Sequence, residues 1–224
     1  MPPGVRLVVL GKQGAGKGTQ CVRLSARYRV PHVSTGDMFR AARRSGSEVG
    51  ERLAKFLRAG ELIPDDVVIE VVGGRLAQPD AAGGFLLDGF PRTTAQAEGL
   101  ADLLAPGDVD LCLNLDVDTD VVMARLTKRR VCASCGAVYS TEQPPAAGWT
   151  CDVCGGPVVQ REDDTQAAIG RRLELYERET APLVAWYLAR DQLVVVDGAG
   201  SPDEVTARLV RAVDSRLPAR RARG

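Results

Sequence analysis

The sequence is poor in histidine and aromatic residues. His32 is the single histidine among 224 residues, and Phe, Trp and Tyr together make up 4% of the chain. Histidine is the side chain that most often carries acid–base catalysis near neutral pH, so this chemistry is not expected here. For His32 we expect a structural role with its hydrogen bonds satisfied.

The chain also lacks an excess of charge of either sign and lacks long hydrophobic runs. Lys+Arg and Asp+Glu both number 29, which argues against non-specific nucleic-acid binding. No apolar run reaches the about 18 residues of a membrane span, and the start at 1–4 leads straight into an apolar run without a signal-peptide pattern. We therefore expect a cytoplasmic protein with reduced cysteines and without nucleic-acid or membrane partners. We also expect a monomer, since no coiled-coil or swapped element suggests a larger assembly.

Short apolar runs alternate with helical patterns along the chain. Hydrophobic residues make up 45% of the sequence, enough for one domain with insertions. Two helical stripes are Cys21, Leu24, Tyr28 and Ile169, Leu173, Tyr176. The predicted strands are 5–10, 85–87, 111–115 and 193–196, with a shorter fifth at 31–34. This alternation predicts an α/β fold with a parallel sheet.

The last helix has a clear predicted start. Ser201 is expected to cap it, with Pro202 in the first turn and Glu204 reaching back to the cap. The stripe that follows is Val205, Leu209 and Val213. This helix should close the fold.

Residues 11–19, GKQGAGKGT, follow the first apolar run and lead into a helical pattern, as in a phosphate-binding loop. Glycines let consecutive backbone N–H groups face one anion, and Lys17 and the helix N-terminus add positive charge. The strict motif has Ser or Thr directly after the lysine, whereas here Gly18 intervenes before Thr19. The alternative is a glycine-rich turn without a ligand.

Two segments, 35–64 and 131–160, do not fit the alternation and are predicted to be insertions beyond the sheet. The second contains two CxxC pairs, Cys132 with Cys135 and Cys151 with Cys154. This spacing predicts a closed four-thiolate site for a structural Zn²⁺. Disulfides and a redox CxxC are the alternatives, and a reducing compartment disfavours the disulfides. Cys21 and Cys112 are predicted to be buried apolar residues.

Several arginines accompany the phosphate loop. Planar guanidinium groups bind oxyanions bidentately, so together they suggest a clamp around several phosphates. Asp88 ends an apolar strand, where a hydrated Mg²⁺ would be a natural partner. The arginines are Arg40, Arg92, Arg129, Arg161 and Arg172.

At these residues the chain closely resembles the adenylate kinase family. The motifs are GxxGxGKGT at 11–19, STGDMFR at 34–40, LLDGFPRT at 86–93, the arginines flanking the CxxC segment, and REDD at 161–164; the resemblance covers 5–215. The family also places glycine between the lysine and the threonine of the loop. The resemblance implies reversible, Mg²⁺-dependent transfer of the terminal phosphoryl group of ATP to AMP, giving two ADP.

The resemblance also implies a domain organisation. The fold would be a three-layer P-loop α/β fold around a five-stranded parallel sheet. Its core would comprise 1–33, 65–130 and 161–217, with an AMP-binding insertion at 34–64 and a zinc-bearing lid at 131–160. The tail at 218–224 would be disordered.

By the same resemblance, individual residues receive expected roles. Asp88 would order Mg²⁺, and Asp163 and Asp164 would join the polar network of the lid. The catalytic residues would be Lys17, Asp88, Arg92, Arg129, Arg161 and Arg172. The ATP site would comprise Gly14, Ala15, Gly16, Lys17, Gly18, Thr19, Arg125, Arg129, Val138, Tyr139 and Gly200. The AMP site would comprise Thr35, Arg40, Glu61, Leu62, Ile63, Gly89, Phe90, Pro91, Arg92, Gln96, Arg161 and Arg172.

The sequence departs from the family pattern at two positions. Tyr139-Ser140 stands where many relatives have Tyr-His, so a histidine contact to ATP does not carry over. Gln13 stands where many have proline.

Two alternative functions remain open at this stage. The first is a UMP/CMP kinase on the same scaffold, although Thr35 stands where pyrimidine enzymes usually carry alanine. The second is a zinc-ribbon nucleic-acid-binding protein with a regulatory phosphate loop. The few Lys and Arg residues between the cysteines argue against it.

Overall fold

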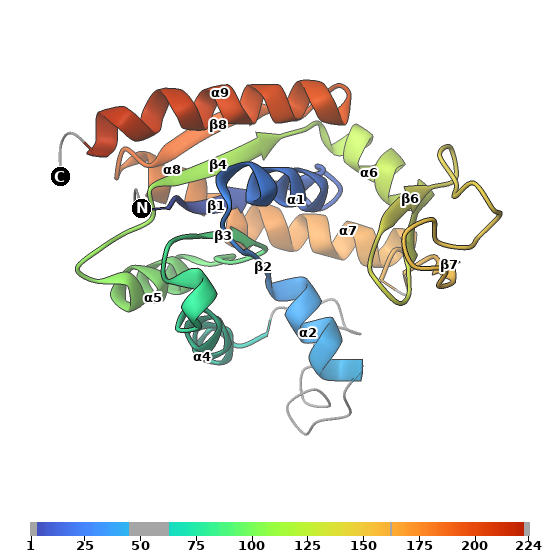
Figure 1. Ribbon diagram of the computed structural model, residues 1–224, viewed down its shortest axis with the longest axis horizontal. Coiled ribbons are helices and arrows are strands. Elements are labelled where there is room, and N and C mark those ends of the chain that lie inside the picture. Colours follow the sequence, from blue (N-terminus) through green and yellow to red (C-terminus); the bar gives the residue numbers. More distant parts are fainter. Residues whose placement is uncertain (1–3, 45–62, 162, 222–224) are drawn as a thin grey trace.

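The computed structural model describes residues 4–44, 63–161 and 163–221, and its centre is a five-stranded parallel sheet (Figure 1). All the predicted strands are present, with every end within one residue of its prediction. In spatial order they are β2 (His32–Ser34), β3 (Phe85–Asp88), β1 (Arg6–Leu10), β4 (Leu111–Asp116) and β8 (Leu193–Asp197). The predicted α/β fold is confirmed.

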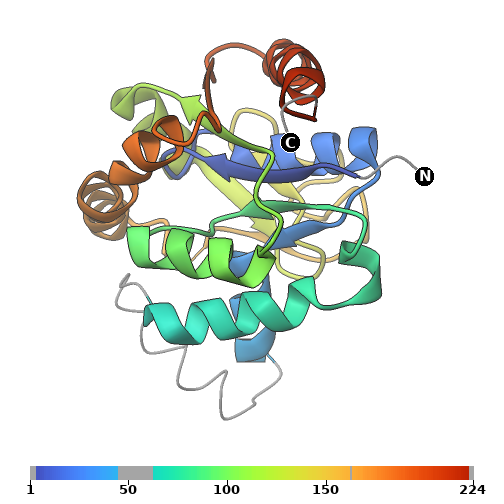
Figure 2. The ribbon, with the colours of Figure 1, turned by 90° about the vertical axis from the view of Figure 1, so that its left-hand side faces the viewer.

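Helices cover both faces of the sheet, making three layers (Figure 2). Successive strand residues point to opposite faces, so Leu7 and Val9 of β1 lie in one hydrophobic cluster and Val8 and Leu10 in the other. The first cluster includes residues of α1 (Lys17–Tyr28), α6 (Thr119–Lys128), α7 (Gln166–Leu175) and α9 (Pro202–Arg221). The second includes residues of α2 (Thr35–Arg44), α4 (Asp65–Leu76), α5 (Thr94–Leu104) and α8 (Pro182–Leu188).

A separate three-stranded antiparallel sheet lies beyond α6 and α7, at the right of Figure 1. Its central strand is β5 (Arg129–Cys132), between β6 (Val138–Ser140) and β7 (Val158–Val159). This is the segment predicted to be a lid, although its sheet begins at Arg129, before the expected boundary at 131. Most of the other expected insertion, 34–64, lies outside the described residues.

Two short helical turns complete the element list. A 3₁₀ turn, η1 (Pro79–Ala81), precedes β3, and a π-helical turn, η2 (Tyr176–Thr180), connects α7 to α8. No helix within the described ranges has the length and apolar character needed to cross a membrane.

The carboxyl ends of the strands meet at one edge of the sheet, which positions the candidate site. Val9 of β1 pairs with Asp88 of β3, and Ser34 of β2 pairs with the same residue. The phosphate loop, the start of α2 and the segment after Asp88 therefore leave the sheet side by side. Open α/β sheets bind ligands at this edge.

The N-terminus of α9 forms the predicted capping box. Ser201 Oγ accepts a hydrogen bond from Glu204 N (3.3 Å), and Glu204 Oε2 accepts one from Ser201 N (2.8 Å). The stripe of Val205, Leu209 and Val213 is buried. Both predictions are confirmed.

The C-terminus of α9 differs from the prediction. The helix continues to Arg221, so the expected disordered tail at 218–224 is wrong for 218–221. Proline inside a helix removes one intrahelical hydrogen bond, but the alanine and arginines that follow Pro218 are strong helix formers.

Substituting Ser201→Ala should lower the free energy of unfolding by about 1 kcal/mol, because it removes the acceptor for the N–H of Glu204. Urea denaturation measures the change. Ser215→Ala in the same helix is the matched control, since Ser215 Oγ donates to the backbone oxygen of Ala212 and caps no helix end. Equal effects of the two substitutions would contradict a capping role for Ser201.

Candidate active site

The phosphate loop connects β1 to α1 and adopts a conformation that needs glycine. Gly11, Gly14 and Gly16 have φ values of 135°, 84° and 99°. A Cβ on Gly14 would lie 2.8 Å from the Leu126 side chain, so the loop packs closely on α6. Gly18 and Thr19 in the first turn of α1 are exposed. The loop therefore presents backbone and helix N-terminus to an approaching anion.

Lys17 folds back over this loop. Its Nζ donates to the backbone oxygens of Gly11 (2.5 Å) and Lys12 (2.9 Å). Burial lowers the pKa of Lys17 to about 8, against the opposing effect of the Asp88 carboxylate. The ammonium has three N–H groups, so one remains available for a phosphate oxygen.

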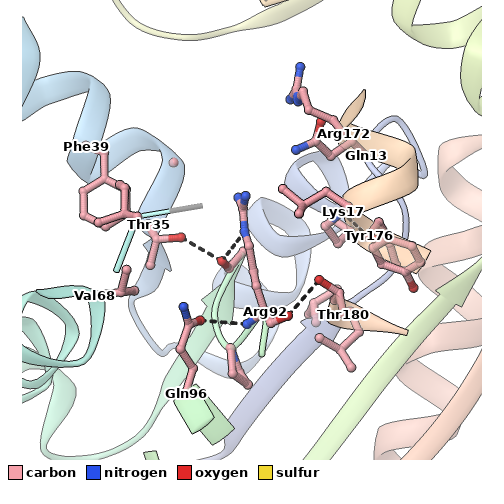
Figure 3. Close-up of a pocket in the computed structure, with 18 of the residues that line it drawn as sticks. Gln13, Lys17, Thr35, Phe39, Val68, Arg92, Gln96, Arg172, Tyr176 and Thr180 are labelled. Carbon is pink, nitrogen blue, oxygen red and sulfur yellow. Dashed lines mark hydrogen bonds between the residues drawn. The ribbon is translucent and has the colours of Figure 1, made fainter. Parts of the chain in front are cut away.

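Arg92, in the segment after β3, is held in place by several hydrogen bonds (Figure 3). Its Nε donates to Gly89 O (2.8 Å), its backbone N donates to Gln96 Oε1 (2.8 Å), and Thr180 Oγ1 donates to its backbone oxygen (2.9 Å). Burial lowers the pKa of Arg92, as does the nearby Arg172. The guanidinium is thus pre-positioned for an anion.

Thr35 begins α2 and is almost fully buried, with 1% of its surface exposed. Its Oγ1 donates to Gly89 O (3.0 Å), the oxygen that also accepts from Arg92. Gly89 has a φ of 80°, and a Cβ there would lie 3.0 Å from Thr35 Oγ1. Thr35, Gly89 and Arg92 therefore form one interdependent unit.

One cleft joins the phosphate loop to this unit, and the side chains of Figure 3 converge on it. The predicted residues that line it are Lys17, Thr35, Arg40, Ile63, Gly89, Pro91, Arg92, Gln96 and Arg172. Other side chains in the lining, for which no binding role was expected, are Val9, Leu10, Gln13, Phe39, Val68, Asp163, Leu175, Tyr176 and Thr180.

Tyr176 corrects a prediction and shows why these residues were missed. Ile169 and Leu173 are buried as predicted, but α7 ends at Leu175 and the π-helical turn begins at Tyr176, which lines the cleft. Tyr176 keeps α-helical backbone angles (φ −60°, ψ −48°) at the end of α7, and its half-buried side chain lies at the edge of the stripe, where the cleft begins. Phe39 stands within STGDMFR, and this motif was the one sequence signal available for it.

A buried carboxylate connects the lid to the core. Asp164 accepts from Arg129 Nε (2.8 Å) and Nη2 (2.5 Å), and its side chain has no exposed surface. The same carboxylate lies 3.4 Å from Arg172 Nη1, which also pairs with Asp163 (2.9 Å). Arg129 is on β5 and Arg172 on α7, so Asp164 links the two elements.

The arginines around the cleft act on one another. Burial, together with the neighbouring Arg129 and Arg40, lowers the pKa of Arg161 to about 10. Burial also lowers the pKa of Arg172, with a contribution from Arg129 in the same direction. A cluster of cations that repel one another favours a ligand with several negative charges.

Asp88 is the last residue of β3, and His32 is the first residue of the neighbouring β2. The Asp88 carboxylate is 3.5 Å from His32 Nε2, and its side chain is 14% exposed. His32 Nε2 is buried without a hydrogen-bond partner among the described residues. The expectation that the hydrogen bonds of His32 are satisfied is therefore wrong for this atom.

Several predicted site residues lie away from the cleft lining. Arg125 Nη1 donates to Ala15 O (3.4 Å) behind the loop, and Gly200 precedes the cap of α9. Phe90 is fully buried in the hydrophobic core, so its ring cannot contact a ligand in this arrangement. Val138 is exposed in the lid. Glu61 and Leu62 lie outside the described residues.

The lid brings its four cysteines together. Sγ of Cys132 lies 3.5 Å from that of Cys154, Sγ of Cys135 lies 3.6 Å from that of Cys151, and all four atoms are within 4.8 Å of one another. All four are free thiols rather than disulfides. Tetrahedral Zn–S bonds of about 2.3 Å place sulfurs about 3.7 Å apart. The quartet therefore fits a zinc ion.

Tyr139 contacts one cysteine of this quartet through its hydroxyl group. Its hydroxyl lies 3.3 Å from Cys151 Sγ and accepts from Asp152 N (2.9 Å). The hydrogen bond from Tyr139 lowers the pKa of Cys151 to about 6, which favours the thiolate that a metal requires. The hydroxyl thus faces the cysteines, and the structure does not place Tyr139 in the cleft lining.

Comparisons with known proteins agree with this geometry. The adenylate kinase family model matches residues 9–192. The adenylate kinase of Moorella thermoacetica is 46% identical over 93% of this chain and 98% of its own length. The adenylate kinase of Thermodesulfovibrio yellowstonii is 47% identical over 90% of this chain and 95% of its own length. The adenylate kinase of Bacillus licheniformis is 45% identical over 95% of this chain and 99% of its own length. The chain therefore belongs to the adenylate kinase family, whose members are phosphotransferases.

Proposed function

We propose that this chain transfers the terminal phosphoryl group of ATP to AMP, reversibly and with Mg²⁺, giving two ADP and maintaining the adenine nucleotide balance. One observation carries the proposal: a single cleft is lined by Lys17 of the phosphate loop and by Thr35, Arg92 and Gln96 opposite it. Donor and acceptor phosphates can thus lie in one enclosure, as direct transfer requires.

The loop side would hold ATP. The backbone of 14–19 and the N-terminus of α1 would bind its phosphates, and Lys17 would neutralise the charge that develops on the transferred group. Members of this family generally use a magnesium–nucleotide complex. Asp88, at the carboxyl end of β3, has a carboxylate suited to hold the waters of that ion.

The opposite side would hold AMP. Arg92 is fixed by its hydrogen bonds to Gly89 and Gln96, and Arg40 lines the same cleft. Together they can bind the monophosphate. Phe39, Val68 and Ile63 add apolar surface suited to a base.

The lid would complete the enclosure. Arg129 at the start of β5, with Arg161 and Arg172, would bind the phosphates as the lid closes and excludes water, which otherwise competes as acceptor. A zinc ion on Cys132, Cys135, Cys151 and Cys154 would order the lid without taking part in the chemistry. We also infer a monomeric cytoplasmic protein without nucleic-acid or membrane partners. The balanced charge argues against non-specific nucleic-acid binding.

A panel of monophosphate acceptors tests this function against the UMP/CMP alternative. With MgATP fixed, ADP formation should be fastest with AMP, by at least about tenfold over UMP and CMP. Faster turnover of UMP or CMP would overturn the assignment. Tight nucleic-acid binding without transfer to any acceptor would favour the zinc-ribbon alternative.

Replacing Lys17→Ala should lower kcat by about 10²–10³-fold or more, because it removes a preorganised cation from the reacting phosphate. The fold should persist, which circular dichroism checks. Lys128→Ala is the control, since Lys128 pairs with Glu142 at the surface and should be near neutral. Near-normal turnover of the Lys17 variant would refute its role.

Substituting Cys132→Ser should lower the melting temperature more than it lowers kcat, because the quartet holds a segment with a very small apolar cluster of its own. A chelator should destabilise the unsubstituted protein and leave this variant unchanged. Ser134→Ala, in the same turn, is the control. Unchanged stability of Cys132→Ser with zinc still bound would rule out a structural metal.

A further inference from the structure

A second group of potential metal ligands lies beneath the phosphate loop, apart from the lid quartet. It consists of Cys21 on α1, His32 on β2 and Asp88 on β3, and its ligand atoms all lie within 4.8 Å of one another. The described residues contain no other such group of three or more besides the lid quartet. The three side chains come from separate elements, so the fold itself creates the group.

Strand register explains why these residues meet. His32 pairs with Leu86, and Ser34 pairs with Asp88. Since side chains alternate along a strand, His32, Leu86 and Asp88 face the same side of the sheet. Leu86 and Cys21 belong to one hydrophobic cluster, so this is the side that α1 covers. Cys21 follows Lys17 by one helical turn and shares its face.

The state of the three groups suits a cation. His32 Nε2 is buried and lacks a hydrogen-bond partner among the described residues, 3.5 Å from Asp88 Oδ2. An imidazole nitrogen without a hydrogen-bond partner can bind a metal ion in its unprotonated form. Burial raises the pKa of Cys21 well above its usual value, so without a metal the group is a neutral thiol. A cation that binds here must displace that proton.

The donor set selects the class of ion. Sulfur and imidazole ligands favour zinc and other thiophilic divalent cations, and oxygen ligands favour Mg²⁺. Bond lengths of about 2.0–2.3 Å require tetrahedral ligands to lie about 3.3–3.7 Å apart. The present separations, none above 4.8 Å, exceed these spacings by about 1.5 Å at most. Thiolate and carboxylate together would match the charge of the ion, which leaves the nearby Lys17 ammonium without the compensating charge of Asp88.

We propose that Cys21, His32 and Asp88 form a second site for zinc or a similar thiophilic divalent cation, and that its occupation inhibits phosphoryl transfer. The site supplies three protein ligands and leaves one position open. The inhibition rests on the function proposed above: an ion that takes the Asp88 carboxylate removes it from Mg²⁺ and adds positive charge beside Lys17. Binding itself does not depend on that function.

Binding is tested on the full chain with the lid already loaded with zinc. Equilibrium dialysis against buffered free Zn²⁺, with excess Mg²⁺ and no nucleotide, should show a second zinc ion per chain. Cys21→Ala should weaken this second ion at least tenfold and leave the first in place. Cys112→Ala is the matched control, because Cys112 is equally buried but has no such partners among the described residues.

Inhibition is tested in parallel. At a free Zn²⁺ concentration that half-fills the second site, the unsubstituted protein should lose about half of its activity. The Cys21→Ala variant should keep the activity that it has without added Zn²⁺. A second ion bound equally tightly by Cys21→Ala and the unsubstituted protein would overturn the site. Loss of binding in Cys21→Ala without any inhibition in the unsubstituted protein would overturn the inhibitory role alone.

Should Cys21→Ala fold poorly, His32→Gln provides the same test at a more exposed ligand. The His32 side chain is 19% exposed, and glutamine removes the imidazole while keeping a polar side chain of similar length. It too should weaken the second ion at least tenfold. Retention of full affinity would count against the site.

Discussion

The mutual repulsion of buried cations is the constraint that shapes this molecule. Burial lowers the pKa values of Lys17, Arg92, Arg161 and Arg172, and several of these groups lower one another further. Such a cluster is costly without compensating charge. Backbone oxygens accept hydrogen bonds from Lys17 and Arg92, Asp164 pairs with Arg129 of the lid, and Asp163 pairs with Arg172 of α7. A polyphosphate relieves the remaining repulsion, so the unfavourable arrangement is also the source of affinity.

The parallel sheet brings the site residues together because the segments that carry them all begin at the same edge of the sheet. Parallel strands end at one edge, and each delivers one part of the site within a few residues of its last hydrogen bond. The phosphate loop follows β1, Thr35 follows β2, and Gly89 and Arg92 follow β3. Register between the strands then sets the spacing of donor and acceptor sides. The strands that form the hydrophobic core therefore also determine where the residues of the site lie.

Local chemistry made the strands, the capping box and the phosphate loop predictable. Ser201 and Glu204 meet because they are neighbours on one turn, and the glycines of 11–18 have a conformational need that the sequence alone reveals. Tyr176 could not be assigned to the cleft, because it continues the helical stripe of Ile169 and Leu173, and only the packing of α7 decides that this edge of the stripe faces the cleft. The unpartnered nitrogen of His32 was also unforeseen, since it depends on what α1 places above β2.

The lid strand β5 has a consequence for how the family can vary. Arg129 opens this strand and Cys132 closes it, so the arginine proposed to bind phosphate and a proposed metal ligand stand three residues apart on one strand. A lid held together by other interactions than the four cysteines would still have to preserve the pairing of Arg129 with Ser140. Without this pairing, the Arg129 side chain would no longer be held in its present direction. If the lid is exchanged for that of a relative, the exchanged segment should therefore begin before Arg129, at the end of α6, so that the whole of β5 is replaced together.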